Sequence, residues 1–150
     1  MNNKNWLIAT IVLVIILAVG CKEERDYSEP EHLLNYWANA TEKLDYSKYS
    51  RIEASPSAER SFRKMYENYY ISNIRITDVD PEEGVNSGKD HNETAIEYKN
   101  VHFIANTVVR NTGKPLQSVR GEVKMIRYPE GRKSDKGWMM SNRTIIRIDQ

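Results

Sequence analysis

The sequence predicts an α+β domain in which N-terminal helices pack on one face of a curved antiparallel sheet. Three observations lead to this class. Apolar residues recur at helical spacing between residues 30 and 69, and the period then changes to two. Turn-forming residues separate the later alternating segments at 80–93, 111–115 and 129–137. Helices that precede a run of antiparallel strands are typical of α+β domains.

The first helix is marked by its start and by an apolar stripe. Ser28 and Glu31 form an S-x-x-E capping box, and Pro30 falls in the first turn, where a missing N–H leaves no bond unmade. The stripe that we expect to face the sheet consists of Leu33, Trp37, Ala40 and Leu44.

Two shorter helices are expected next. Asp45 is a candidate cap for a helical turn whose inward residues are Tyr46, Tyr49 and Ile52. Ser55 and Pro56 then suit the start of a third helix, a capping residue followed by proline. Its expected inward stripe is Ala58, Phe62, Met65 and Tyr69.

Strands follow, since the segments after residue 69 are rich in β-branched and aromatic residues. Residues 69–79 predict one strand, and 94–110 are long enough for one bent strand or two. In 116–128, alternation places Val119, Gly121, Val123 and Met125 on one face and Arg120, Glu122 and Lys124 on the other. In 138–148 it places Trp138, Met140, Ile146 and Ile148 opposite Arg143 and Arg147.

The N-terminus differs in character from the rest of the chain. After Lys4, residues 6–20 form an uncharged apolar run of 15 residues. A run of this length is typical of a secretory signal and is shorter than the roughly 20 residues that span a bilayer. The alternative is an uncleaved membrane anchor.

The end of this run, Ala18-Val19-Gly20-Cys21, resembles a bacterial lipobox, at which lipoproteins are diacylated on cysteine and cleaved before it. The resemblance implies a signal peptide over 1–20 and a lipid such as palmitate on Cys21. The polar composition after the cysteine predicts a tether over 21–29, and the length of the chain predicts one domain over 30–150. Lys22, rather than an aspartate, follows the cysteine. The resemblance therefore implies an outer-membrane protein facing the periplasm, if the source has an outer membrane.

Composition limits the possible functions. The chain has 22 Lys and Arg against 21 Asp and Glu, so no strong field attracts it to nucleic acid. A single cysteine excludes an internal disulfide and a multi-cysteine metal site. The sequence contains no glycine-rich phosphate loop, serine-nucleophile motif or H-x-x-x-H pair. We therefore expect no metal, no cofactor and a binding or structural role rather than an enzyme.

The mature chain carries a second resemblance. Residues 33–49, 62–79 and 137–146 (the last opening with Gly-Trp) are similar in their order of elements to the cystatin-like α+β roll of the NTF2-like superfamily. This resemblance implies a cone-shaped sheet whose mouth can hold a small ligand. An alternative applies to the C-terminal half alone, because residues 108–126 also resemble a hairpin of immunoglobulin-like β-sandwiches.

The NTF2-like resemblance also implies where a site would lie. Enzymes of that superfamily, such as isomerases and dehydratases, use an Asp or His inside the cone, for which Asp45, Asp78 and His102 are candidates. If the cone binds a small apolar ligand, the expected pocket residues are Tyr36, Trp37, Tyr70, Tyr98, His102 and Asn106.

Charge is distributed unevenly along the mature chain. Residues 110–150 hold ten Lys and Arg against four Asp and Glu, whereas residues 21–109 hold eleven against seventeen. A possible docking face for an anionic partner, such as an envelope protein, consists of Arg120, Lys124, Arg143 and Arg147. The alternative is a solvated face that guards exposed strand edges.

Overall fold

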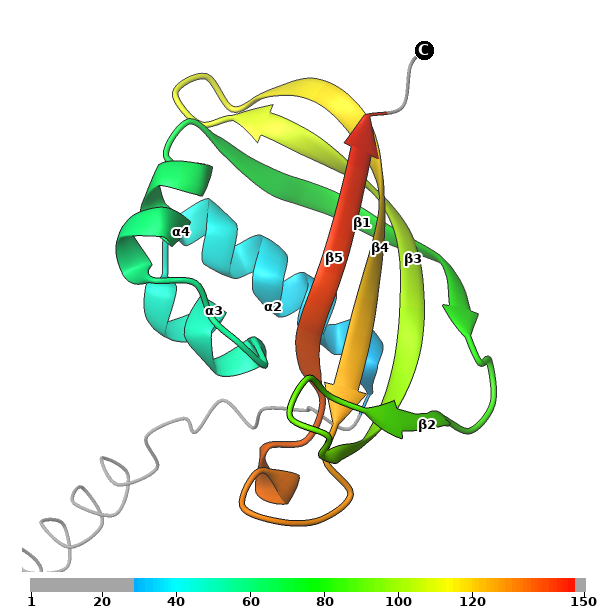
Figure 1. Cartoon of the computed structure of the whole chain (residues 1–150). Coiled ribbons are helices and arrows are strands. Elements are labelled where there is room, and N and C mark those ends of the chain that lie inside the picture. The colour runs from blue at the N-terminus through cyan, green and yellow to red at the C-terminus, as the bar shows by residue number, and fades with distance from the viewer. Residues whose placement is uncertain (1–28, 148–150) are drawn as a thin grey trace, which may run out of the picture.

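The computed structural model describes residues 29–147 and shows an α+β domain (Figure 1). Three helices come first: α2 (Pro30–Lys43), α3 (Tyr46–Ile52) and α4 (Glu59–Tyr66). Five strands follow: β1 (Tyr69–Asp80), β2 (Asn86–Lys89), β3 (Ala95–Val109), β4 (Lys114–Arg127) and β5 (Met139–Arg147), with a 3₁₀ turn, η1 (Ser134–Lys136), before β5. The predicted class and order of elements are confirmed.

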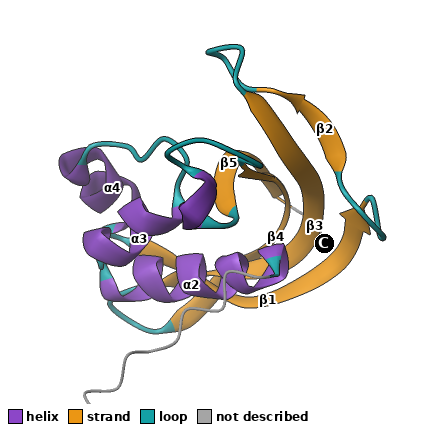
Figure 2. Ribbon diagram, turned by 90° about the horizontal axis from the view of Figure 1, so that it is seen from below, coloured by secondary structure: helices purple, strands orange, loops and turns teal. Residues whose placement is uncertain are grey.

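The strands form one antiparallel sheet in the order β1-β3-β4-β5, and β2 pairs with the part of β3 that β1 leaves free. The sheet curves around the helices, which lie on its concave face (Figure 2). All described strands belong to this sheet, so helices rather than a second sheet form the other layer. The immunoglobulin-like alternative would need a second sheet.

The first two helices follow the predicted pattern. Leu33, Trp37 and Ala40 have no exposed surface, so the α2 stripe is confirmed. The N-cap of α2 is Glu29, and Ser28 of the expected capping box lies outside the described residues. Asp45 caps α3 by accepting a hydrogen bond from the Lys48 backbone N–H at 3.0 Å.

The prediction for the third helix is wrong in its start and in three of its four stripe residues, since Ala58 and Tyr69 are exposed and only Phe62 is buried. The helix begins at Glu59 and not at Ser55-Pro56. Met65 is 60% exposed, and Tyr66 takes the expected inward place. Tyr66 lies one helical turn after Phe62, and its hydroxyl accepts a hydrogen bond from Trp37 Nε1 at 3.3 Å, which fixes this face inward.

The strand predictions hold except in two places. Residues 95–109 form one continuous strand, and Val119, Val123 and Met125 are buried on the helix side as expected. The short strand β2 was not predicted, because it falls within the polar segment 80–93 and has no β-branched residue. The second departure is in β5, where one extra residue between the Met140 and Arg143 pairs interrupts the alternation.

Arg110 joins the ends of two helices to the sheet. Its Nη2 donates to the carbonyl oxygens of Thr41, at 2.7 Å, and Tyr66, at 3.0 Å, and its Nη1 donates to the Glu42 carbonyl. The last carbonyls of a helix lack partners within the helix and carry partial negative charge, so a guanidinium there is favourable.

We expect Arg110→Met to lower the free energy of unfolding by about 1.5 kcal/mol, because the hydrogen bonds are charge-assisted but partly exposed. Urea denaturation measures the change. Arg120→Met, an exposed arginine on β4, is the matched control and should change stability by less than about 0.5 kcal/mol. Equal losses in the two variants would contradict this role of Arg110.

Candidate binding site

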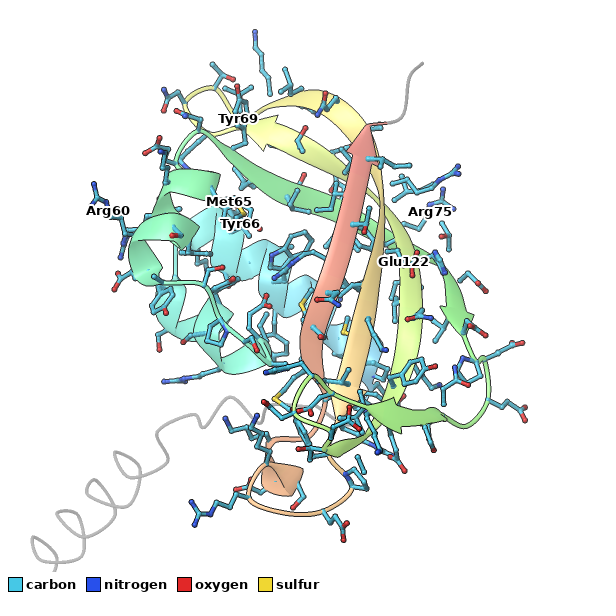
Figure 3. The ribbon with its side chains drawn as sticks, viewed as in Figure 1. Arg60, Met65, Tyr66, Tyr69, Arg75 and Glu122 are labelled. Carbon is cyan, nitrogen blue, oxygen red and sulfur yellow. The ribbon has the colours of Figure 1, made fainter. Side chains whose placement is uncertain are left out.

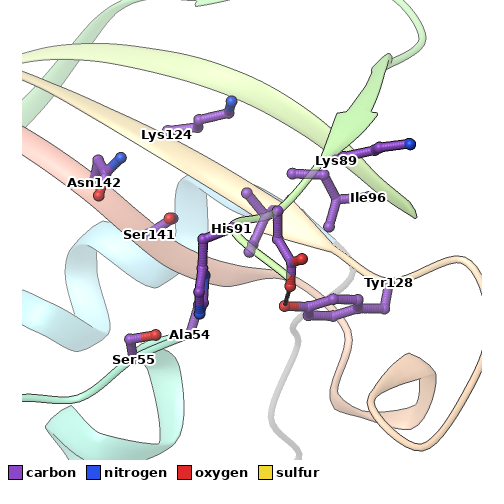
Figure 4. A pocket seen from close by; sticks show the side chains of 11 residues that line it. Ala54, Ser55, Lys89, His91, Ile96, Lys124, Tyr128, Ser141 and Asn142 are labelled. Carbon is purple, nitrogen blue, oxygen red and sulfur yellow. Dashed lines mark hydrogen bonds between the residues drawn. The ribbon is translucent and has the colours of Figure 1, made fainter. Parts of the chain in front are cut away.

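A pocket of about 310 Å³ lies at one end of the sheet, on the face away from the helices (Figure 4). Its walls come from four places: the α3–α4 segment, the β2–β3 turn, the end of β4 and the start of β5. Its floor is apolar and consists of Ala54, Ile96 and Ile126. The size is at the lower end of the range of small-molecule sites.

Strand alternation creates this floor. Val123 and Met125 point to the helix side, so Lys124 and Ile126 of β4 point to the opposite face. There a second, small apolar cluster forms from Ile96, Ile126, Tyr128 and Met139.

The α3–α4 segment reaches the pocket because it is attached to the edge of β5. Glu53 forms a parallel bridge with Met140, and the Ala54 N–H donates to the Met140 carbonyl at 2.8 Å. Ala54 thereby becomes part of the pocket floor and Ser55 part of its wall.

Asp90 is held by three hydrogen bonds at the other side of the pocket. Its Oδ1 accepts from the backbone N–H groups of Asn92, at 2.9 Å, and Thr94, at 3.0 Å, and its Oδ2 accepts from the Tyr128 hydroxyl at 2.8 Å. Desolvation alone would raise the pKa of Asp90, but these hydrogen bonds together lower it. Asp90 therefore serves as an ionised acceptor that shapes the β2–β3 turn.

Tyr128 keeps its proton because its surroundings raise the pKa of its hydroxyl group. Desolvation raises its pKa first, and the hydrogen bond to Asp90 and the charge of that carboxylate raise it further. Lys133 Nζ lies 4.8 Å from the centre of the Tyr128 ring, on the loop before β5.

The two lysines of the pocket differ in their partners. Lys89 forms an ion pair with Glu93, with Nζ and Oε2 2.9 Å apart. Lys124 Nζ lies 3.8 Å from the centre of the Tyr98 ring, a cation–π contact. Within residues 29–147, no carboxylate lies within ion-pair distance of Lys124. The pocket therefore holds one ammonium whose charge is not neutralised by a neighbouring carboxylate.

The residues predicted to line a pocket inside the cone do not come together. Trp37 is fully buried in the helix-side core, while His102 and Asn106 belong to the opposite set of β3 residues. In the strand pairing, His102 lies opposite Asp78 of β1 and Glu122 of β4. Asn106 Oδ1 accepts a hydrogen bond from Ser118 Oγ at 3.3 Å.

The three predicted tyrosines are also dispersed. Tyr36 packs against the helix-side core. Tyr70 lies under Arg110, whose Cζ is 5.4 Å from the ring centre, and Tyr98 lies under Lys124. Tyr98 is thus the member of the predicted set that lies next to the described pocket.

The predicted basic face is wrong for Arg143. Val123 pairs with Arg143, whereas Met125 pairs with Met140, so β5 has one residue more than β4 between these pairs. This bulge reverses the alternation and places Arg143 on the helix-facing side. The backbone of Arg147 pairs with that of Val119.

Inside the domain, Arg143 contacts groups that the sequence did not link to it. It forms an ion pair with the buried Glu53, and its Cζ lies 5.0 Å from the centre of the Trp37 ring. Desolvation raises the pKa of Glu53, and the charge and hydrogen bond of Arg143 oppose this effect only in part. This pair is a structural link between α3 and β5.

Of the four predicted basic residues, Lys124 lines the pocket and Arg120 is exposed.

Among the described residues, His, Cys, Asp and Glu side chains do not gather in any group of three or more that could hold a metal ion. In the same part of the chain, none of the helices is long and apolar enough to cross a membrane. Cys21 lies outside the described residues.

Comparisons of the chain with protein-family models, with curated proteins and with solved structures found no match.

Proposed function

We propose that this chain is a lipid-anchored protein of the cell envelope whose folded domain is a non-catalytic binding module. The lipid would be carried by Cys21, and Lys22 favours the outer membrane, with the domain facing the periplasm. The observation that supports the binding role is the pocket on the convex face, with its apolar floor and its unneutralised Lys124.

The chemistry of the pocket supports binding over catalysis. A general base needs an available carboxylate with a pKa near the working pH. Asp90 instead accepts three hydrogen bonds, and its pKa is lowered. Tyr128 is a poor proton donor to a substrate, because its pKa is raised and its hydroxyl already donates to Asp90.

We also propose that the fold is an NTF2-like roll. Helices on the concave face of a curved sheet with long central strands support this assignment (Figure 2). The centre of the concave side is filled by side chains with no exposed surface, among them Trp37, Phe103 and Met125. Binding by this domain is therefore assigned to the convex face and not to the interior of the cone.

The lipid anchor makes a direct prediction. Cys21→Ser should abolish labelling by a palmitate analogue and leave the apolar segment 6–20 uncleaved, because the thiol that carries the acyl chains is gone. Lys22→Ser is the matched control and should still be labelled. Labelling of Cys21→Ser at the level of the unmodified chain would contradict the anchor.

The partner is expected to be another envelope component that contacts the pocket. A photo-reactive amino acid at Asn142, an exposed pocket residue, should crosslink to it in intact membranes. The same probe at Glu130, an exposed loop residue outside the pocket, is the control. The same crosslinks from both positions, or none from Asn142, would count against the binding role of the pocket.

A further inference from the structure

We propose that the pocket binds a small monocarboxylate with an apolar body, and that the Lys124 ammonium holds its carboxylate. This inference rests on the proposed binding function and names the ligand chemistry of the same site. It does not depend on the lipid anchor, so the two can fail separately.

The local charge at Lys124, a single ammonium, suits a monoanion better than a dianion. Lys89 forms an exposed ion pair with Glu93, and Asp90 is a fixed negative charge that accepts a hydrogen bond from Tyr128. Lys124 is the remaining cation of the pocket, and its contact with the Tyr98 ring leaves ammonium donors available. A phosphate monoester carries about −1.5 to −2 charges and is best bound by guanidinium forks. No arginine is among the residues that line this pocket.

Uncharged donors are available beside Lys124. Ser55, Ser141 and Asn142 contribute two hydroxyl groups and one amide to the wall (Figure 4). Figure 4 shows Ser141 and Asn142 on the strand next to that of Lys124, whose ammonium lies over the Tyr98 ring, and a bound carboxylate would draw this ammonium back toward the neutral donors. Charge-assisted hydrogen bonds of this kind are about twice as strong as neutral ones.

The floor determines the other half of the ligand. Ile96 and Ile126 are each 4% exposed, and Ala54 completes an apolar surface without hydrogen-bonding side chains. An aliphatic group of four to six carbons, as an order-of-magnitude fit to about 310 Å³, would cover this floor. Such a carboxylate could be a free organic acid or the C-terminal leucine of a peptide.

The test is an NMR titration of the full chain in detergent, observing the methyl groups of Ile96 and Ile126. Isocaproate should give saturable shifts, and isocaproamide, which has the same shape without the charge, should bind at least about tenfold more weakly. Equal binding of the two, or no saturable shift up to about 20 mM isocaproate, would overturn the proposal.

Variants locate the carboxylate. Lys124→Met should weaken isocaproate binding about tenfold or more, whereas Lys114→Met, an exposed lysine at the start of β4, should leave it unchanged. Asn142→Asp is a second variant at an exposed position, and its added negative charge should also weaken binding. Unchanged binding in both pocket variants would contradict the assignment of Lys124.

Further arms identify the source of the carboxylate. A short peptide that ends in a free leucine should bind more tightly than isocaproate if the ligand is a chain terminus, and more weakly if it is a free acid. Inorganic phosphate that displaces isocaproate at equal concentration would show that the ligand class is wrong. Cys21→Ser should bind isocaproate as tightly as the unmodified chain does. The measurement therefore distinguishes failure of the lipid anchor from failure of ligand binding.

Discussion

Arg143→Met is expected to lower the free energy of unfolding by about 3 kcal/mol at pH 8, because it leaves the Glu53 carboxylate buried without its cation. Glu53 is 6% exposed, and Arg143 is its ion-pair partner. Urea denaturation of the variant and of the unmodified chain measures the difference. The double variant Arg143→Met/Glu53→Gln should recover most of the loss, since it removes both charges.

This loss should depend on pH in a defined direction. Burial raises the pKa of Glu53 above its ordinary value of 4.5, and removal of Arg143 should raise it further. A carboxyl group whose pKa is raised on folding contributes most stability below its unfolded pKa, and this contribution is lost as the pH rises through the folded pKa. The loss in Arg143→Met should therefore shrink as the pH falls from 8 towards about 5.

Two controls define what would contradict this account. Glu53→Gln alone should be less destabilising than Arg143→Met, because desolvation of Glu53 outweighs its attraction to Arg143. Arg143 Nη1 is buried without a hydrogen-bond partner among the described residues, which also makes removal of the arginine easier to tolerate once Glu53 is neutral. A loss that is independent of pH, or a double variant as unstable as the single one, would contradict the account.

Gly121→Ala is expected to cost about 2 kcal/mol or more, because an added methyl group has no space. A Cβ atom at this position would lie 2.2 Å from Phe103 Cζ, and Phe103 is the residue directly opposite in β3. Phe103 is fully buried, and its ring centre lies 6.1 Å from that of Trp37, so the ring cannot move away freely.

A double-mutant cycle tests this packing. Phe103→Leu removes the ring atoms that the new methyl group would meet, so Gly121→Ala should cost at least about 1 kcal/mol less in that background. Thermal and urea unfolding give the four stabilities. Additive losses would show that Gly121 is not required by the Phe103 ring.

Helices α2 and α3 and strand β4 could be predicted because a simple period or a local cap marks each of them. The α2 stripe of Leu33, Trp37 and Ala40 is confirmed, as is the alternation of Val119, Gly121, Val123 and Met125 in β4 (Figure 3 shows Glu122 of the same strand on the outer face). Asp45 was predictable as a cap since its role depends on the next three residues alone.

Arg143 could not be predicted correctly, because its orientation depends on one extra residue in β5 that no glycine or proline marks. Strict alternation from Met140 would place it outside, and the bulge places it inside. The attachment of Glu53 and Ala54 to Met140, about 90 residues away, is equally invisible in local patterns.

The pocket could be predicted only in fragments. The sequence predicts Lys124 as part of a basic docking face and Tyr98 as part of a pocket inside the cone. In the structure, buried core side chains fill the cone. Their contact follows from the pairing of β3 with β4, in which Tyr98 lies opposite Ile126 and Asn100 lies opposite Lys124. Asp90, Ser55 and Ser141 come from three distant segments, and no spacing in the sequence connects them.

The most direct test of the central claim, a lipid-anchored binding module, is the intact mass of the protein extracted from membranes. The account predicts a chain that begins at Cys21 and carries the added mass of its acyl chains, with this mass absent from Cys21→Ser. An unmodified chain that still begins at Met1 in the membrane fraction would contradict it.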